Sequence, residues 1–352
     1  MQQSDVPIHG RGAAANPPNR FDRLHYEPDP EAADEGPGPA TQFLRDSSRT
    51  IIAYNDSPDV GFDASINPYR GCEHGCIYCY ARPTHEYLGF SAGLDFETKI
   101  LVKEKAPELL RKELASKKWQ PQVLGISGVT DPYQPVERRM RLTRRCLEVL
   151  AEFRNPVAVI TKNHLVARDK DLLALLARHN AAVVFLSITT LDADLARKME
   201  PRTSHPQGRL DAIRELTEAG IPTGVMTAPV IPGLTDHELP ALLDAAAKAG
   251  ARSAGYTMLR LPNAVSGLFE SWLTQHFPER KDKVLGRIRE IRGGRLNDPN
   301  FSSRMRGDGI FAQVTKELFA LGCRNAGIVK RDLNLSTAAF RRPSGGQPTL
   351  FD

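Results

Sequence analysis

The sequence lacks the long apolar runs that cross membranes. Its 352 residues contain no stretch of about 18 uninterrupted apolar side chains. The N-terminal segment MQQSDVPIHGRG also lacks the apolar core of a secretory signal peptide. We therefore expect a soluble cytoplasmic protein with no membrane partner.

Cysteine is scarce, with five residues in the chain, which excludes a disulfide-stapled framework. Cys146 and Cys323 stand alone, and we expect both to be structural. The other three, Cys72, Cys76 and Cys79, fall within eight residues. Thiols this close together in a cytoplasmic chain indicate a metal site.

Neither sign of charge dominates: 47 basic against 42 acidic side chains give a net charge of +5. This excess combines −4 over residues 1–40 with +9 over the remainder. A basic body suits an anionic partner such as nucleic acid, but a charged surface that serves solubility alone has the same composition. The net charge alone therefore does not decide whether the protein binds nucleic acid.

The two ends of the chain differ in composition from its middle. The first 40 residues hold seven prolines and four glycines with almost no apolar periodicity. We expect a disordered N-terminal tail over residues 1–45, a core domain over 46–262, a helical extension over 263–340 and a flexible tail over 341–352.

Between the tails, apolar β-type runs alternate with amphipathic helical stretches. The expected strands cover 98–103, 122–127, 156–161, 181–189, 222–230 and 253–261. The expected helices cover 107–117, 142–153, 168–179, 207–219 and 236–249, and beyond the core 265–277, 279–292 and 308–321. Six strands alternating with helices predict an α/β fold, a partial (βα)6 TIM-like barrel of parallel strands, with its active site in the loops after the strands.

The segment Asn67-Pro-Tyr-Arg-Gly-Cys-Glu-His-Gly-Cys-Ile-Tyr-Cys lies just before the first of these expected strands. Its Cys-x3-Cys-x2-Cys spacing suits three irons of a cubane and leaves the fourth iron without a protein ligand. A structural zinc site is the alternative, and it needs a fourth ligand such as His74 or His85. The spacing alone leaves both readings open.

Cysteines in this spacing, with Tyr78 as the aromatic residue before the third, resemble the radical S-adenosylmethionine superfamily. The resemblance covers roughly residues 60–262 and implies a [4Fe–4S] cluster whose open iron binds S-adenosylmethionine. It also implies reductive cleavage of that cofactor to a 5'-deoxyadenosyl radical, which abstracts hydrogen from a substrate, and a low-potential electron donor of the flavodoxin or ferredoxin type.

Two further segments, Gly125 to Glu137 and Val159-Ile-Thr-Lys-Asn, most resemble the spore photoproduct lyase-like branch. By this resemblance Thr130 hydrogen-bonds the cofactor, Lys162 pairs with its carboxylate and Ser187 approaches its ribose or methionine end. Pro229-x-Ile231-x-Gly233-x-x-Asp236 is a degenerate match to the superfamily's Gly-x-Ile-x-Gly-x-x-Glu, which places Ile231 beside the adenine. Each of these residues also has an ordinary structural reading as a turn, solvated or core position.

One departure separates the chain from that branch. Photoproduct lyases carry a hydrogen-donating cysteine after the second strand, where this chain reads Ser127-Gly-Val-Thr. The substrate is therefore open, with a nucleic-acid base the leading candidate. A non-catalytic zinc or iron–sulfur protein associated with DNA is the alternative.

The C-terminal residues Gln347-Pro-Thr-Leu350-Phe351 resemble the short Gln-x-x-Leu-Phe peptides by which bacterial DNA-maintenance proteins dock on the sliding clamp. Two apolar anchors behind a Gly-Gly lead-in suit a partner's groove. The sliding clamp is thus one candidate partner, and the alternative is that Leu350 and Phe351 fold back on the barrel.

Overall fold

The main sheet of the protein is open and mostly parallel. The computed structural model describes residues 8–22, 39–328 and 334–343. Within them, a seven-stranded sheet has the order β10-β9-β8-β7-β6-β3-β2. All neighbours pair in parallel except β2 (Ile52–Tyr54), which is antiparallel to β3 at one edge. The six parallel strands are β3 (Ala64–Ile66), β6 (Leu124–Ile126), β7 (Val157–Thr161), β8 (Ala182–Ser187), β9 (Thr223–Val230) and β10 (Ser253–Met258).

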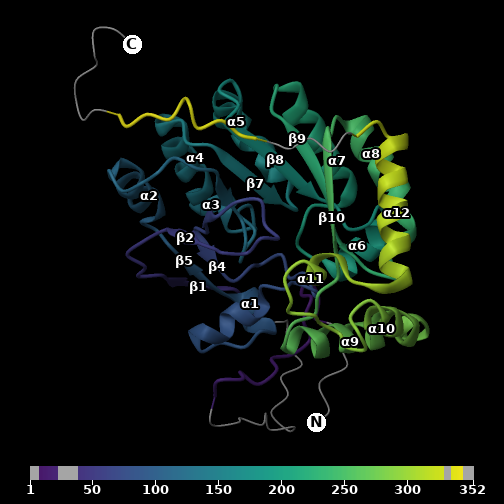
Figure 1. Cartoon of the computed structure of the whole chain (residues 1–352). Coiled ribbons are helices and arrows are strands. Elements are labelled where there is room, and N and C mark those ends of the chain that lie inside the picture. The colour runs from purple at the N-terminus through teal and green to yellow at the C-terminus, as the bar shows by residue number, and fades with distance from the viewer. Residues whose placement is uncertain (1–7, 23–38, 329–333, 344–352) are drawn as a thin grey trace.

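Helices cover the outer face of this sheet (Figure 1). The crossover helices are α2 (Ala106–Ala115), α4 (Leu142–Phe153), α5 (Lys170–Ala177), α7 (Pro206–Glu218) and α8 (Leu239–Ala249). Shorter helices are α1 (Leu94–Thr98), α3 (Glu137–Met140), α6 (Ala193–Met199) and α11 (Ser303–Arg306), with 3-10 turns at Arg82–Leu88, His164–Asp169, Asp236–Glu238 and Pro278–Arg280. Because β10 and β2 do not pair, the barrel is partial, and the predicted fold class is confirmed.

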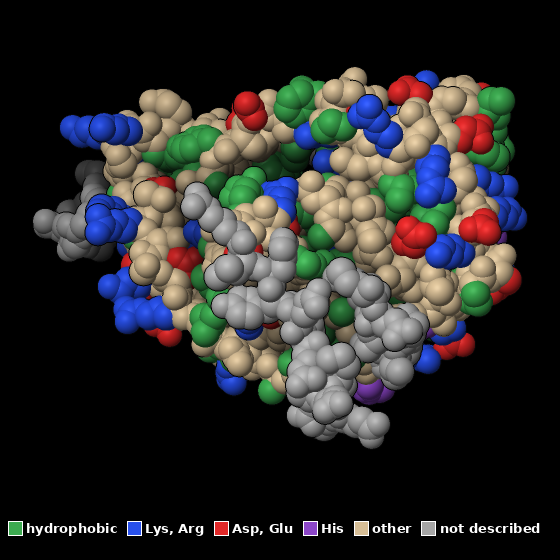
Figure 2. All heavy atoms as spheres, turned by 90° about the horizontal axis from the view of Figure 1, so that it is seen from below, with side chains coloured by type: hydrophobic (Ala, Val, Ile, Leu, Met, Phe, Trp, Pro, Cys, Tyr) green, Lys and Arg blue, Asp and Glu red, His purple; other side chains and the backbone are tan. Residues whose placement is uncertain are grey.

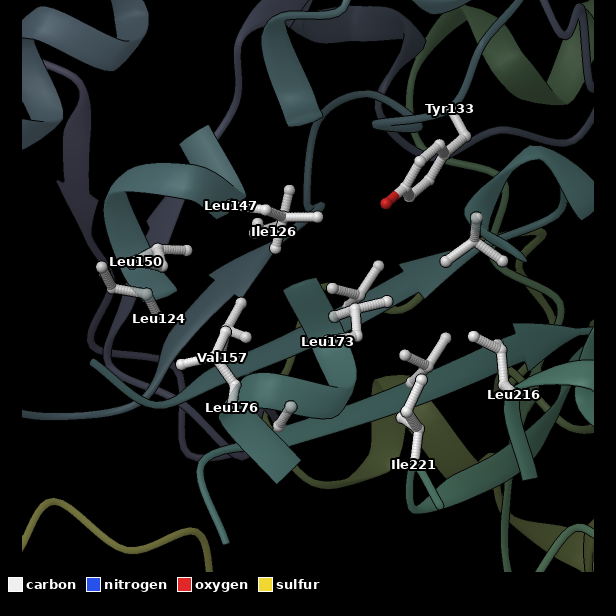
Figure 3. Packing of buried hydrophobic residues seen from close by; sticks show 14 of the residues in the cluster. Leu124, Ile126, Tyr133, Leu147, Leu150, Val157, Leu173, Leu176, Leu216 and Ile221 are labelled. Atoms are coloured by element: carbon white, nitrogen blue, oxygen red, sulfur yellow. The ribbon is translucent and has the colours of Figure 1, made fainter. Parts of the chain in front are cut away.

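Helix α4 shows how sequence pattern produces this packing. Leu142, Cys146, Leu150 and Phe153 lie on one face and are all buried. The last helical residue is Phe153, and the capping residue Arg154 adopts a left-handed conformation. Pro156 then precedes β7. Its apolar face joins the strands' outward side chains in one core (Figure 3). Cys146 is fully buried there, as expected of a structural thiol.

The first barrel strand differs from the expected one. Residues 98–103 do form a strand, β5 (Lys99–Val102), but it belongs to a separate three-stranded sheet with β1 (Gln42–Arg45) and β4 (Tyr69–Arg70). The first barrel strand is β3, whose three residues are too few to show a period. The cysteines therefore follow the first barrel strand rather than precede it.

The expectation of a disordered tail over residues 1–45 is wrong for its described parts. Ala13 is buried in an apolar cluster with Cys76 and Ile77. Asn19 donates from its side-chain amide to the carbonyls of Glu86 and Phe90. These contacts offset the ordering entropy that composition alone leaves uncompensated.

The C-terminal extension packs on the core through three helices, α9 (Ala264–His276), α10 (Lys281–Glu290) and α12 (Gly309–Asn325). Helix α12 lies along α8, and α9 and α10 pack in the cluster that contains Cys76. At the start of the expected flexible tail, Arg341 donates its backbone N–H to Phe153, and Arg342 donates to Trp119. The proposed clamp peptide at Gln347 to Phe351 lies outside the described residues.

Two surface features bear on partners. None of the helices in the described part of the chain is long and apolar enough to span a bilayer. Viewed from below, the visible lysine and arginine side chains lie among acidic ones (Figure 2).

Candidate active site

The cysteine loop, residues 71–80, lies after β3 and the short β4, at the carboxyl edge of the barrel. Cys72 and Cys76 are buried, and Cys79 is partly exposed. Backbone hydrogen bonds hold the loop at several points: the Cys72 N–H donates to Phe96, and the Ile77 N–H donates to Met199. The loop is thus a fixed part of the fold.

The Arg82 side chain stabilises the cysteine loop through hydrogen bonds to its backbone carbonyls. Its guanidinium, which is fully buried, donates to the carbonyls of Cys76 at 3.0 Å and Gly75 at 3.2 Å. It also pairs with the buried carboxylate of Glu97 at 2.5 Å. Removing one partner of such a pair leaves an uncompensated buried charge, so the two residues act as a unit.

The thiols lie in surroundings that disfavour thiolates unless a positive charge is supplied. Burial, followed by the neighbouring Cys72, raises the pKa of Cys79 to about 11, while Arg82 opposes the shift. Burial raises the pKa of Cys76 too, and Lys162 opposes that shift. A metal centre supplies such a charge and deprotonates coordinating thiols, so this donor set fits an iron–sulfur cluster. Across residues 8–22, 39–328 and 334–343, no three histidine, cysteine or acidic side chains already form a single-ion site.

The two histidines that could complete a zinc site have other surroundings. The His74 ring lies 3.1 Å from the Asn163 amide nitrogen and 3.4 Å from Asp131. The His85 ring is buried beside Phe96, and this burial lowers its pKa to about 4. His74 thus joins the cysteine loop to the loops after β6 and β7.

Lys162 follows β7 and is the predicted partner of the cofactor's carboxylate. Its ammonium donates to the Ala228 carbonyl at 3.0 Å and lies 3.8 Å from Glu200. Burial lowers the pKa of Lys162 to about 8. The ammonium also lies 5.8 Å from the centre of the Tyr78 ring in the cysteine loop. Lys162 is therefore held between the cysteine loop and the ends of the central strands.

Glu200 connects these same parts through its carboxylate. It accepts hydrogen bonds from Tyr78, Thr189 and Arg209, and Arg209 also donates to the Ser187 carbonyl at 2.8 Å. Burial raises the pKa of Glu200, and Arg209 opposes that shift. The Glu200–Arg209 pair thus fixes the aromatic residue of the cysteine loop to the end of β8.

Asp131 plays a similar part after β6. It accepts from the Thr161 hydroxyl at 2.7 Å and from the Lys162 N–H at 2.8 Å. Burial alone would raise the pKa of Asp131, but His74 and these hydrogen bonds lower it. Its negative charge therefore orients the backbone at Lys162.

Thr130 supports the cysteine loop directly. Its hydroxyl donates to the Gly71 carbonyl at 2.7 Å and accepts from Gln134, whose amide oxygen accepts the Glu73 N–H. With its hydrogen donated to Gly71, the hydroxyl has acceptor capacity left for a ligand. Its contact with a cofactor remains a prediction.

Ser187 and Ile231 occupy different environments. Alternate residues of β8, Val184 and Leu186, pack outward in the core, so Ser187 at the strand's end belongs to the inward-facing set. Inward-facing Ile160, Phe185 and Met226 are partly exposed, which shows that side chains do not fill the barrel. Ile231 is fully buried in the cluster with Cys76, and the Thr235 hydroxyl accepts its N–H. Cofactor roles for both residues remain predictions.

Sequence reasoning did not assign a role to Glu200, Arg209 or Gln134. Glu200 begins the polar segment Glu200-Pro-Arg202, whose sequence does not identify a partner for its carboxylate. Arg209 lies on a helix and is fully buried, and nothing in its local pattern distinguishes it from a solvated arginine.

The class of protein follows from this geometry together with a family comparison. Residues 66–246 match the model of the radical SAM superfamily, and the chain belongs to that superfamily. An uncharacterized protein of Mycobacterium tuberculosis is 38% identical over 260 residues, covering 72% of this chain and 75% of the relative.

Spore photoproduct lyase is a more distant relative. The Bacillus subtilis protein is 27% identical over 184 residues, covering 50% of this chain and 48% of the relative. The solved structure of spore photoproduct lyase complexed with dinucleoside spore photoproduct aligns with a TM-score of 0.57 at 15% identity, over 80% of this chain and 79% of that one. The expected resemblance to this branch is confirmed, and the structural likeness establishes the fold.

Proposed function

We propose that the protein is a radical S-adenosylmethionine enzyme in which Cys72, Cys76 and Cys79 bind a [4Fe–4S] cluster. The observation that carries this proposal is the place of the three cysteines. They lie in a fixed loop at the carboxyl end of the first barrel strand, and the Lys162 ammonium lies 5.8 Å from the centre of the Tyr78 ring in that loop. Three thiolates leave the fourth iron open for a ligand.

When bound, the cluster and cofactor supply a 5'-deoxyadenosyl radical that abstracts hydrogen from the substrate. The residues of this chain bind and orient the cofactor. Lys162 pairs with its carboxylate, Thr130 accepts a hydrogen bond, Ser187 lies toward its ribose or methionine end, and Ile231 flanks the adenine. Family membership implies the cluster and the cofactor, and a flavodoxin or ferredoxin type of protein would supply the electron.

A nucleic-acid base is the proposed substrate class. Its support is the similarity to spore photoproduct lyase, seen in complex with a dinucleoside, and the basic excess of the chain outside residues 1–40. The loop after β6 offers no thiol between Ser127 and Thr130, so we do not extend the repair reaction itself to this chain.

Anaerobic reconstitution tests the proposal. We expect about four irons and four sulfides per chain and, with a reductant, release of 5'-deoxyadenosine from S-adenosylmethionine. Cys76→Ala should lose both, whereas Cys146→Ala, at a buried thiol outside the loop, should keep its iron. One bound zinc without cofactor cleavage would overturn the proposal in favour of a non-catalytic metal protein.

A further inference from the structure

The open side of the barrel is bridged by contacts between its two edges. Asp59, in the turn between β2 and β3, accepts from the Arg304 guanidinium at 2.7 Å and from the Ser302 N–H at 2.9 Å. Arg304 also donates to Ser57 at 2.5 Å. Since β10 does not pair with β2 or β3, these contacts hold the segment after α10 across the gap.

Arg260 lies at this gap, two residues after the end of β10. Its guanidinium carbon is 5.5 Å from the centre of the Tyr80 ring, and Tyr80 directly follows Cys79. The Tyr80 hydroxyl donates to the Gly128 carbonyl at 2.6 Å, in the loop after β6. A side chain that follows the last strand thus lies beside Tyr80 of the cysteine loop, and Tyr80 in turn bonds to the loop after β6. This places Arg260 at the mouth of the barrel.

The Arg260 guanidinium is poorly satisfied by protein groups. Its Nε is buried without a hydrogen-bond partner among the described residues, and its Nη1 donates to the Met305 sulfur at 3.7 Å. Nearby arginines are occupied, because Arg304 pairs with Asp59 and Arg292 donates to the Met258 and Leu259 carbonyls. Burial and the charge of Arg304 lower the pKa of Arg260 more than Tyr80, Asp59 and Asp298 raise it, so the burial of its charge is incompletely compensated.

We infer that Arg260 binds a phosphate group of the substrate at the mouth of the barrel, an inference that rests on the proposed function. A guanidinium presents a planar fork of donors that suits a phosphate, and a partly buried, under-compensated one gains most from an anion. In the proposed function the carboxylate of the cofactor pairs with Lys162, which follows the third barrel strand, β7. Arg260 is therefore available to bind the substrate. The exposed ring of Tyr80, beside the guanidinium, offers a stacking face for a base.

The test compares binding of two dinucleotide probes to the reconstituted full-length protein with S-adenosylmethionine present. One is a thymidine dinucleotide with a phosphodiester, and the other is its uncharged methylphosphonate counterpart. We expect the wild-type protein to bind the phosphodiester at least about tenfold more tightly. Arg260→Gln should remove that difference, Arg260→Lys should keep part of it, and Arg289→Gln on the exposed face of α10 should keep all of it.

Thymidine monophosphate distinguishes the two forms of phosphate. Tighter binding of the monoester than of the dinucleotide assigns Arg260 to a terminal phosphate, and the reverse assigns it to a backbone diester. Equal binding of the charged and uncharged dinucleotides by the wild-type protein overturns the inference, as does an undiminished difference in Arg260→Gln. Cofactor cleavage by the wild-type protein is measured separately, so a failure of the proposed function is distinguishable from a failure of this inference.

Discussion

At the scale of single residues, the site depends on buried charges that contact one another across different strands. Lys162, Glu200 and Arg209 come from three separate segments and meet beside Tyr78. Each charge is costly to bury alone and becomes tolerable through the others. A substitution at one of these residues therefore changes the electrostatic surroundings of the other two.

Lys162→Met should weaken binding of S-adenosylmethionine by about tenfold to a hundredfold, because it removes a charge-assisted hydrogen bond. Lys162→Arg should retain part of the affinity. Equilibrium dialysis on reconstituted protein measures the dissociation constant, and iron content checks that the cluster is intact. Lys170→Met, at an exposed lysine on α5, is the control, and equal affinity in the Lys162 and Lys170 variants would contradict the assignment.

Glu200→Ala should lower the free energy of unfolding by about 3 kcal/mol or more, because it leaves the buried Arg209 guanidinium unpaired. Glu152→Ala removes the partner of Arg111 at the surface and should cost at most about 1 kcal/mol. Urea denaturation of both variants measures the contrast. A Glu200 variant no less stable than the Glu152 variant would show that the buried pair contributes nothing.

The sequence allowed the residues of the cysteine motif to be predicted because their spacing along the chain carries the signal. It did not allow Gln134 to be predicted, because the partner of its amide oxygen, Glu73, lies 61 residues away in the chain. It did not allow Arg209 to be predicted, because only the fold buries its guanidinium against Ser187. Thr130 lies beside the cysteine loop, where its hydroxyl donates to Gly71, and its contact with the cofactor stays a prediction.

At the scale of elements, long periodic segments were predictable and short ones were not. Helix α4 begins and ends at the predicted residues because its apolar positions recur along twelve residues. Strand β3 has three residues and was missed, and β5 has a β-type pattern that does not reveal which sheet it joins. A pattern reports the faces of an element but not its partners.

The N-terminal segment, residues 8–22, packs so closely on the cysteine loop that Gly12 allows no side chain. A Cβ at Gly12 would lie 1.7 Å from the Gly75 carbonyl oxygen. The N–H groups of Gly12 and Ala13 donate to the Glu97 carboxylate that pairs with Arg82. The segment thus completes the hydrogen bonding of the group that holds the loop.

Gly12→Val should therefore destabilise the protein by about 1–3 kcal/mol and reduce its retained iron, because the segment must move away from the loop. Thermal unfolding and iron content after reconstitution measure both effects. Gly61→Val is the control, since a Cβ there meets nothing within 4 Å. Equal stability and iron content in the two variants would show that the close approach at Gly12 is unimportant.

At the scale of the whole molecule, segments distant in sequence converge on the cysteine loop. Ala13 from the N-terminal segment, Ile231 from the core and Phe269 from the C-terminal extension share the apolar cluster of Cys76. The domain boundaries expected from composition therefore do not separate independent packing units. Composition could not show this, because burial of the N-terminal segment depends on surfaces supplied by residues far along the chain.

The last described residues before the proposed clamp peptide, which include Arg341 and Arg342, pack against the barrel. Arg341 and Arg342 bond to backbone at the end of α4 and after α2. The chain enters β7 directly after α4, so these helix ends lie at the amino edge of the barrel, opposite the cysteine loop. A peptide that continues from this edge would bind a clamp without covering the active site. Removal of residues 347–352 should thus abolish clamp binding in calorimetry and leave cofactor cleavage unchanged; undiminished clamp binding by the truncated protein would exclude this peptide as the docking element.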